Sequence, residues 1–360
     1  MQVGYFAMPL HPPGSDFTKT VHDDLAQIVA LDKLGYSEAW IGEHFTTVWE
    51  NIPAPELFIA QALAMTKNIK LGTGVTCMPN HNPFHIAHRI AQLDHQAKGR
   101  FMWGIGSGAT LLDFKAFGID YANNEQRPLT RENLDMVLKI WDGLKPGTYE
   151  NKFWKFTMPE PMEDLGFWVH MKPYQKPYPP IAVAGLSPKS DTLIMAGQRD
   201  WIPMSINYVP TVSLKTHWDV YEEASRGAGN VPDRKRWRIA REVFVADTTE
   251  EARDVALHGV LARDFNDYFM PALTKYKLLH FLKSDPSTPD SALNAEYMAD
   301  NIWLVGSAED VAKKLRKLYK DVGGFGTLLA MAHEWKPEKN WRRSMELLAK
   351  EVIPSLSDLK

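Results

Sequence analysis

The chain has 360 residues, 44% of them hydrophobic, a formal net charge of −3 and a single cysteine. This charge gives no reason to expect a nucleic-acid or membrane-surface partner, and one cysteine excludes a disulfide within the chain. The apolar start lacks a basic segment and no apolar run approaches the length of a membrane span, so we expect a cytoplasmic protein with no membrane partner.

The first third of the chain alternates short apolar runs with longer amphipathic ones. The runs predict strands at 2–7, 37–42, 69–76 and 100–105, and helices at 17–34, 55–65 and 83–97. Ser15 or Asp16 is expected to cap the first helix, and Gly35 to end it. Strands and helices that alternate in this way are typical of a parallel sheet.

The pattern becomes irregular after Gly106 and then resumes. It predicts a helix at 130–144, an insertion rich in proline and aromatic residues at 145–180, and a small hairpin at 149–156 within it. Further strands are predicted at 181–184, 201–205, 237–245 and 325–331, and helices at 190–197, 212–227, 248–262, 308–321 and 339–352. Together these segments predict one domain over 1–360, a (β/α)8 TIM barrel with insertion segments. An open doubly wound sheet is the alternative architecture.

The segment 283–299 interrupts this rhythm with prolines and small polar residues. A loop of this length inside a compact domain is more often a lid or binding loop than filler. A disordered insertion is the alternative.

The second predicted strand ends in Glu43 and His44. In a parallel barrel both residues emerge at the C-terminal mouth, where active sites lie, and histidine is well suited to exchange a proton near neutral pH. A structural hydrogen bond is the alternative reading. Asp113 and Glu242 are further acidic candidates near strand ends, for which salt bridges are the ordinary explanation.

Two loops have the composition of ligand-binding turns. The glycines at 104–108 would let the backbone approach a ligand closely. Their third glycine does not stand at the spacing of a dinucleotide-binding fingerprint. Ser187 and Pro188 predict a helix start whose amides, with Lys189 and Ser190, would suit a phosphate. A tight turn and a plain helix cap are the alternatives.

Other polar and aromatic residues suggest weaker predictions. His81, His85 and His88 lack an acidic or cysteine partner, so no metal site is expected. Aromatic and methionine residues near predicted strand ends would form an apolar pocket if they meet at one mouth: Tyr5, Phe6, Met8, Trp49, Met78, Met204, Tyr208 and Trp335.

In its motifs the chain resembles the bacterial-luciferase-like, FMN-dependent monooxygenases over nearly its whole length. The similarity rests on segments 34–40, 43–44, 49–57, 69–75, 79–83, 99–101, 104–109 and 323–327. Within that family it is most similar to limonene-monooxygenase-like and diketocamphane-monooxygenase-like members, which act on apolar, often terpenoid, compounds.

The resemblance implies a barrel with a lid at 283–299, usually a homodimer. It implies a two-component monooxygenase, in which a separate flavin reductase supplies reduced FMN and O2 provides one oxygen atom for a small apolar substrate. The sequence contains no NAD(P)H-binding fingerprint, which agrees with a separate reductase. A deazaflavin-dependent dehydrogenase and a non-catalytic flavin-binding subunit are the alternatives.

Carried over by position, the resemblance implies that His44 is the catalytic histidine. Glu43 would help to orient it, and Asp113 would lie near the flavin. The implied cofactor-binding residues are Gly74, Val75, Thr76, Gly106, Ser107, Gly185, Ser187, Lys189 and Ser190. The resemblance also implies a cis peptide bond between Gly74 and Val75.

The chain departs from the luciferases at two places. Gly106 and Ser107 stand where the luciferase catalytic chain has cysteine and arginine, so that arginine contact to the phosphate is absent. Either Lys189 and backbone amides replace it, or the phosphate is bound more weakly. Phe45 stands where many luciferases have a second histidine, so light emission from an aldehyde is not expected.

Overall fold

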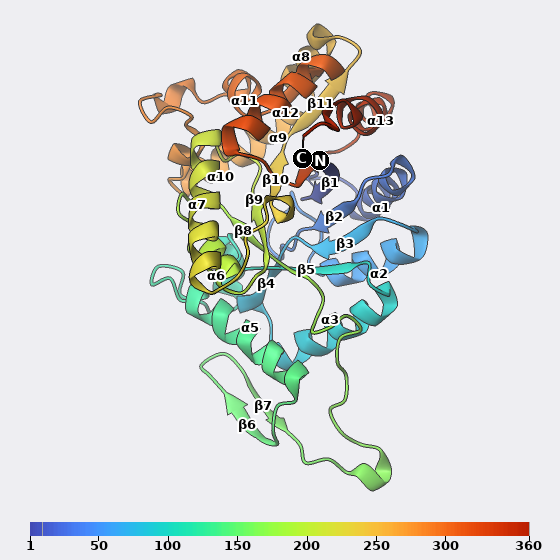
Figure 1. Ribbon diagram of the computed structural model, residues 1–360, viewed down its shortest axis with the longest axis vertical. Helices are drawn as coiled ribbons and strands as arrows, with labels where there is room; N and C mark the ends of the chain where they lie inside the picture. Colours follow the sequence, from blue (N-terminus) through green and yellow to red (C-terminus); the bar gives the residue numbers. More distant parts are fainter. Residues whose placement is uncertain (9, 360) are drawn as a thin grey trace.

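A closed parallel barrel forms the centre of the molecule (Figure 1) in this computed structural model, which describes residues 1–8 and 10–359. Its strands are β1 (Gln2–Ala7), β2 (Glu38–Ile41), β3 (Lys70–Thr73) with its continuation β4 (Thr76–Cys77), β5 (Phe101–Gly106), β8 (Ile181–Gly185), β9 (Ile202–Ser205), β10 (Arg238–Arg241) and β13 (Thr327–Met331). Strand β1 pairs with β2 and β13, and β3 pairs with β5, so the ring closes. The predicted (β/α)8 TIM barrel is confirmed, and the open doubly wound sheet is wrong.

Helices surround this barrel and connect its strands. They are α1 (Phe17–Leu34), α2 (Pro55–Met65), α3 (Pro83–Ala97), α4 (Leu111–Ala116), α5 (Gln126–Asp142), α6 (Asp191–Gln198), α7 (Thr211–Gly227), α8 (Thr249–His258), α9 (Val260–Asp264), α10 (Met270–Lys275), α11 (Ala295–Asn301), α12 (Ala308–Val322) and α13 (Glu338–Leu347). Asp16 caps α1 by accepting a hydrogen bond from the Lys19 amide, and Gly35, at φ 84°, ends it in the left-handed conformation. The predicted bounds of α1, α2 and α3 are confirmed.

Short helical turns complete the connections. They are Met78–Asn80, Glu163–Leu165, Arg234–Arg236, Phe265–Phe269, Leu279–Leu282, Asp290–Ala292, Leu348–Val352 and Pro354–Leu356. Among the described residues, no helix combines the length and the apolar character needed to cross a bilayer.

The inside of the barrel has its own apolar cluster. Its members alternate along the strands with residues that pack outward: Phe6, Trp40, Met102, Ala182, Ile202, Met204, Ala240, Leu329 and Met331. A Cβ atom on Gly72 would lie 2.6 Å from Cε3 of Trp40, so the indole fills the space that a side chain on β3 would need. Successive side chains on a strand point to opposite faces. A residue two or four positions beyond a member of this cluster is therefore also expected to point inward.

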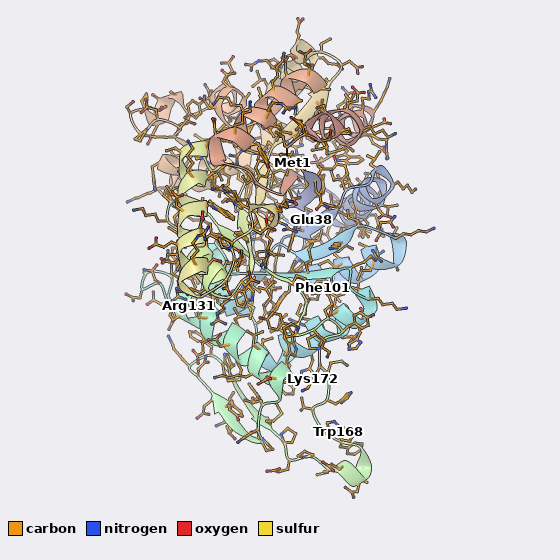
Figure 2. All side chains as sticks on the ribbon, viewed as in Figure 1. Met1, Glu38, Phe101, Arg131, Trp168 and Lys172 are labelled. Carbon is orange, nitrogen blue, oxygen red and sulfur yellow. The ribbon has the colours of Figure 1, made fainter. Side chains whose placement is uncertain are left out.

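The insertion at 145–180 projects from one end of the molecule (Figure 1). Strands β6 (Gly147–Glu150) and β7 (Lys155–Met158) form an antiparallel hairpin, so the predicted hairpin is confirmed. The Phe156 ring lies 5.2 Å from the Phe84 ring at the start of α3, which anchors the hairpin to the barrel. Trp168 lies near the tip of the projection (Figure 2), with 49% of its surface exposed.

The predicted strand at 237–245 is two strands. Strand β10 ends at Arg241, and β11 (Val243–Ala246) leaves the barrel to pair with β12 (Leu304–Ser307), a strand that the pattern did not predict. This pair lies with α8, α12 and α13 at the end of the molecule opposite the β6–β7 hairpin (Figure 1). The charged residues Arg241 and Glu242 stand at this break, but both strands are buried on either side of it, so the segment was predicted as one strand.

Two further boundaries differ from the predictions. The segment 283–299 is not a loop throughout, since α11 begins at Ala295 with Asn294 as its cap. The helix predicted at 248–262 divides into α8 and α9 at Gly259. Thr248 caps α8, because its side chain accepts a hydrogen bond from the Glu251 amide.

Candidate active site

Strand alternation directs Glu43 and His44 to opposite faces of the barrel wall. Trp40 points inward on β2, so Gly42 and His44 are also inward positions, whereas Glu43 is an outward one. His44 therefore lies at the mouth, at the C-terminal end of the strands, above the apolar interior. The sequence pattern predicted both residues at the mouth. It could not show which of them points inward, because that depends on how the strand sits in the barrel.

His44 is held between a carboxylate and a hydroxyl group. Its Nε2 atom lies 2.9 Å from Oε2 of Glu50, and its Nδ1 atom lies 2.9 Å from Oγ1 of Thr110. Burial disfavours the charged imidazole, but the Glu50 carboxylate outweighs that effect, so the pKa of His44 is raised. Its side chain is 17% exposed, which leaves part of the ring open to a ligand.

Glu50 is the partner that the sequence analysis missed. Its second oxygen accepts a hydrogen bond from the Tyr268 hydroxyl, and the Tyr268 ring stacks on Trp49 with centroids 5.6 Å apart. The carboxylate is thus fixed from two segments that are far apart in the sequence. Glu50 stood within one of the segments of family resemblance, but nothing in the sequence indicated that it faces His44.

The prediction that Glu43 orients His44 is wrong in its geometry. Both oxygens of Glu43 contact Nε2 of His81, at 2.9 and 3.0 Å, on the outer side of β2. The Arg89 guanidinium lies 3.1 Å from Nδ1 of His81, and because it can only donate, the imidazole is neutral and donates from Nε2 to Glu43. Glu43 also accepts a hydrogen bond from the buried Cys77 amide, so it braces the loop after β4.

Asp113 supports the segment that follows His44. It accepts hydrogen bonds from the Thr46 hydroxyl and from the Phe45 amide, and its Oδ2 atom lies 3.9 Å from Nδ1 of His44. Asp113 is 3% exposed and lies in the first turn of α4, a helix that the pattern did not predict. The structure thus brings Asp113 close to His44.

Small residues stand at inward positions on one side of the mouth. Gly74 follows β3, and Gly106 and Ala184 lie on β5 and β8; the three strands are neighbours in the barrel. The peptide bond between Gly74 and Val75 is cis, as the resemblance implied. A Cβ atom on Gly106 would lie 2.6 Å from Cγ2 of Val75, so this wall has no room for a side chain there. Small residues beside an apolar interior suit a planar ring.

The loop after β8 lies beside the loop after β5, because Val183 pairs with Ile105. The helix start predicted at Ser187 is wrong, whereas the predicted helix at 190–197 agrees with α6 to within one residue. The helix begins at Asp191 with Ser190 at the cap position, and Ser187 lies in the preceding turn. Lys189 has a φ of 52°, a left-handed backbone that a helix interior does not allow. The Ser190 hydroxyl lies 2.8 Å from the Thr192 hydroxyl, and Ser190 is 4% exposed.

His217 on α7 holds the loop after β8 in place. The Trp237 indole donates to the Ser205 hydroxyl, which leaves the Ser205 proton for Nδ1 of His217, 2.9 Å away. Nε2 of His217 therefore carries the proton and donates to the Ser187 carbonyl at 3.0 Å. Burial lowers the pKa of His217 to about 4, so the imidazole stays neutral.

Two cations lie near the loops at 107 and 187. Arg127, at the start of α5, forms an ion pair with Asp191 of α6 at 3.1 Å, and the Thr130 hydroxyl of the same helix lies 2.9 Å from the Ser107 hydroxyl. Lys189 has an exposed side chain on the loop itself. The sequence analysis missed Arg127, because it is 20 residues beyond Ser107 and only the fold brings them together.

The structure also places the residues that were expected to form an apolar pocket. Of the expected pocket residues, Phe6, Met204 and Met8 belong to the inner cluster or pack on it, whereas Tyr5 points outward and donates to Gln27. Within the described part of the chain, no group of three or more histidine, cysteine or acidic residues is arranged to hold a metal ion.

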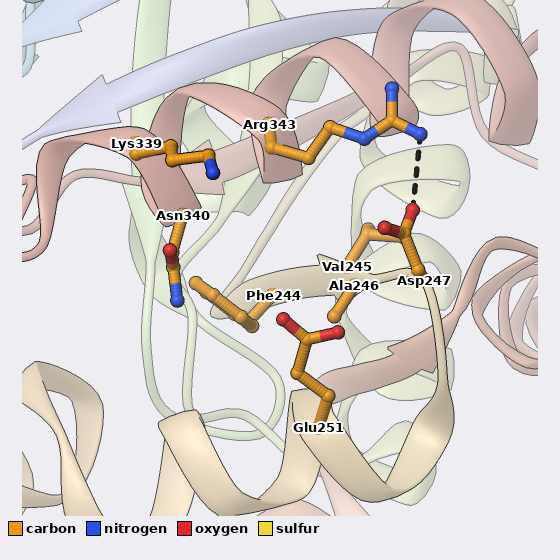
Figure 3. A pocket seen from close by; sticks show the side chains of 8 residues that line it. All are labelled: Phe244, Val245, Ala246, Asp247, Glu251, Lys339, Asn340 and Arg343. Atoms are coloured by element: carbon orange, nitrogen blue, oxygen red, sulfur yellow. Dashed lines mark hydrogen bonds and ion pairs between the residues drawn. The ribbon is translucent and has the colours of Figure 1, made fainter.

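A separate hollow of about 160 Å³ lies between β11, α8 and α13 (Figure 3). Arg343 and Asp247 at its edge form an ion pair at 3.0 Å. The residues that line it include none of the predicted site residues. This hollow is therefore distinct from the mouth around His44.

Comparison with known proteins gives a consistent assignment. The family model described as luciferase-like monooxygenase matches residues 1–324. The 3,6-diketocamphane 1,6-monooxygenase of Pseudomonas putida is 33% identical, over 99% of this chain and 98% of that protein. The limonene 1,2-monooxygenase of Rhodococcus erythropolis is 31% identical, over 98% and 85%.

A solved structure agrees with these relatives. The oxygenating constituent of 3,6-diketocamphane monooxygenase from Pseudomonas putida, described as a type II Baeyer-Villiger monooxygenase in complex with FMN, superposes with a TM-score of 0.91. It is 34% identical and covers 98% of each chain.

Proposed function

The chain belongs to the luciferase-like monooxygenase family, and on that premise we propose that it is the oxygenase component of a two-component, FMN-dependent enzyme. It takes reduced FMN from a separate flavin reductase and inserts one atom of O2 into an apolar cyclic substrate. Its relatives at 30% identity or more are monooxygenases over nearly the full chain, so the deazaflavin dehydrogenase and the non-catalytic subunit are not favoured.

The mouth of the barrel fits an FMN ring. Gly74, Gly106 and Ala184 form a wall of small residues, and apolar side chains such as Phe6 and Met331 belong to the inner cluster of the barrel. Reduced FMN, when bound, activates O2 and transfers one oxygen atom. Val75 and Ser107 border the same wall and would contact the ring or its chain, while the apolar interior excludes water from the reacting atoms. The Thr76 hydroxyl instead accepts a hydrogen bond from the Trp103 indole in the outer cluster.

The phosphate of FMN would bind between the loops after β5 and β8. Ser187, Lys189 and Ser190 come from one loop, and Gly185 ends β8 where the Leu193 side chain packs closely against it. Arg127 supplies a second cation and replaces the arginine that is absent at position 107. Because a guanidinium binds a phosphate through two parallel hydrogen bonds, this replacement restores charge-assisted binding.

His44 is the residue proposed to hold and move the proton. The observation that supports this role is the contact between Nε2 of His44 and Oε2 of Glu50, at a partly open site above the apolar interior. The raised pKa keeps the imidazole protonated further toward neutral pH, so it can donate a proton to the reacting oxygen. Asp113 keeps the adjacent loop in place, and Glu43 braces the loop that carries His81.

The resemblance alone supports three further parts of the proposal. They are a homodimer, a cytoplasmic location and a lid over 283–299. In the lid, Lys283 and Asp290 form an ion pair at 2.7 Å, which closes the loop on itself.

The decisive experiment supplies chemically reduced FMN and 18O-labelled O2 to the purified protein. Terpenes, cyclic ketones and alkanes are then screened by mass spectrometry. We expect one labelled oxygen atom in the product of at least one cyclic compound. Oxygen consumption without any labelled product across the whole screen would contradict the proposed function.

A further inference from the structure

The loop between β8 and α6, residues 186–190, is held along one edge by helix α7. Helices α6 and α7 lie side by side (Figure 1). Their backbones approach closely, because a Cβ atom on Gly197 of α6 would lie 2.4 Å from the carbonyl oxygen of Tyr221 on α7. The two helices therefore pack at a fixed separation, and residues of α7 reach the loop that precedes α6.

Thr216 of α7 contacts the backbone of this loop at Lys189. Its hydroxyl oxygen accepts a hydrogen bond from the Lys189 amide, 3.1 Å away. The hydroxyl proton is donated to the Ser213 carbonyl of α7 at 2.8 Å, so toward the loop the hydroxyl group acts only as an acceptor. Lys189 has a φ of 52°, a left-handed conformation that a residue other than glycine rarely adopts. The contact with Thr216 therefore holds the loop in a backbone conformation that Lys189 does not favour by itself.

His217, the next residue of α7, contacts the same loop at the Ser187 carbonyl. Its Nε2 atom donates to that oxygen at 3.0 Å, while its Nδ1 atom accepts from the Ser205 hydroxyl at 2.9 Å. A carbonyl oxygen carries a partial negative charge, which repels a phosphate. Because this oxygen faces α7 and is bonded there, it is kept away from an anion on the other side of the loop.

The other side of the loop faces α5. Asp191, directly after the loop, forms an ion pair at 3.1 Å with Arg127 of α5. The Ser187 carbonyl and the Lys189 amide are both engaged by α7. The amides of Ser190 and Asp191 donate to no other residue that the structure describes, as is usual where a helix begins. The loop thus lies between a helix that holds it and a side that offers free donors.

We propose that Thr216 and His217 are positioning residues for the cofactor, which hold the loop after β8 in the conformation that receives the phosphate of FMN. The proposal rests on the proposed FMN-dependent function. Both side chains are engaged with the loop backbone, so they act on the phosphate through the loop and not by contact. The preference of the protein for FMN over riboflavin is therefore set in part by α7, behind the loop.

The first test uses a matched pair of variants at the half-buried Thr216. Thr216→Val keeps the shape of the side chain and removes the acceptor, whereas Thr216→Ser keeps the hydroxyl group. We expect Thr216→Val to bind oxidised FMN about tenfold more weakly, as for the loss of one hydrogen bond, and riboflavin equally well. Thr216→Ser should bind both flavins like the unmodified protein. Fluorescence titration measures the dissociation constants. The control is Thr211→Val on α7, since the Thr211 hydroxyl bonds to no described residue.

The second test uses a matched pair at the buried His217. In His217→Gln the amide nitrogen takes the place of Nε2 and can still donate to the Ser187 carbonyl. In His217→Asn the amide takes the place of Nδ1, so the contact with Ser205 is kept and the donor to the loop is lost. We expect only His217→Asn to lose about tenfold in FMN affinity, with riboflavin unchanged. Circular dichroism checks that both variants fold, and if they do not, the Thr216 pair decides.

A third measurement needs no flavin. Amide hydrogen exchange is followed by mass spectrometry in peptides that cover 185–192, in the protein without cofactor. We expect faster exchange in this segment for Thr216→Val and His217→Asn, and unchanged exchange for Thr216→Ser, because the loop loses its bonds to α7 only in the first two. Exchange as slow as in the unmodified protein in both of them would contradict the role of α7 in holding the loop.

The outcomes separate this inference from the proposed function. Equal weakening of FMN and riboflavin, or unchanged FMN affinity in both Thr216→Val and His217→Asn, would overturn it. Equal affinity of the unmodified protein for the two flavins would overturn it together with the placement of the phosphate. If the variants lose the preference for FMN but the unmodified protein makes no oxygenated product, the inference stands and the monooxygenase function fails.

Discussion

Nε2 of His44 lies 2.9 Å from Oε2 of Glu50, and this contact joins the end of β2 to the loop that precedes α2. Tyr268 contacts the same carboxylate from a turn more than 200 residues further along the chain. A general acid must be held in one orientation to act on a bound reactant. The loops of the barrel supply that orientation here.

Replacing His44 should separate oxygen consumption from product formation. His44→Gln keeps an amide donor for Glu50, so the loop is retained, but the group that exchanges a proton is lost. We expect product formed per O2 consumed to fall by about 10²- to 10⁴-fold, the usual contribution of a general acid or base. The ratio is measured with an oxygen electrode and product analysis. His85→Gln, at an exposed histidine, serves as the control, and an unchanged ratio in His44→Gln would refute the assigned role.

Neutralising Glu50 should move the pH profile. Burial lowers the pKa of His44, but the Glu50 charge raises it, and the net result is a raised pKa. Glu50→Gln should therefore lower the pKa of His44 and shift the alkaline limb of the pH–rate profile to lower pH. The folded pKa lies above the unfolded value of about 6.5. The stabilisation that the ion pair between His44 and Glu50 gives to the folded state is therefore fully present below the unfolded pKa of His44. It is lost as the pH rises through the folded pKa of His44.

The measurements for Glu50 are the pH–rate profile and the denaturation midpoint at several pH values. Glu309→Gln, which removes an exposed carboxylate on α12, is the matched control. An alkaline limb at the same pH in Glu50→Gln and in the unmodified protein would show that this carboxylate does not set the pKa of His44.

The phosphate site should distinguish FMN from riboflavin. Arg127→Gln and Ser190→Ala remove donors near the loop after β8, so each should weaken FMN binding by about tenfold, as expected for a charge-assisted hydrogen bond. Riboflavin lacks the phosphate, and its affinity should stay the same. Fluorescence titration measures both ligands, and Arg226→Gln on α7 is the control. An equal loss for both ligands would place these residues at the ring instead.

Gly104 should be intolerant of any side chain. A Cβ atom there would lie 1.9 Å from the Thr73 carbonyl oxygen on the neighbouring strand, and backbone cannot move aside cheaply. Gly104→Ala should reduce the free energy of unfolding by about 1–3 kcal/mol, as overpacked cores do. Gly227→Ala, at the end of α7 with open space around it, should leave stability unchanged or raise it. Urea unfolding followed by circular dichroism compares the two variants, and equal midpoints would contradict the expected crowding.

The sequence was sufficient for the barrel and for the position of His44. Glycines, caps and hydrophobic periods are local signals, and they located α1, α2 and α3 to the residue. They did not locate the break between β10 and β11, because the charged pair Arg241 and Glu242 that marks it is buried, as are the strand residues around it. The pairing with β12 depends on residues about 60 positions away.

The partners of the site residues were harder to predict than the residues themselves. Glu50 contacts His44 from another loop, and the two loops approach each other only after the barrel has closed. Glu43 was assigned to His44 because the two are adjacent in sequence, and adjacency along a strand is the arrangement that directs side chains apart. Ser187 was assigned as a cap from its neighbour Pro188, but the left-handed backbone of Lys189 delays the helix to Asp191.

The opposite directions of Glu43 and His44 make the length of β2 as important as its composition. Deleting or inserting one residue between Trp40 and Glu43 would exchange the two side chains, with a carboxylate entering the apolar basin and an imidazole facing α3. Point substitutions leave this register intact. A shift by one residue would remove the contacts of His44 inside the mouth and those of Glu43 outside it at the same time. Variants with altered loops should therefore preserve the residue count from Trp40 to His44.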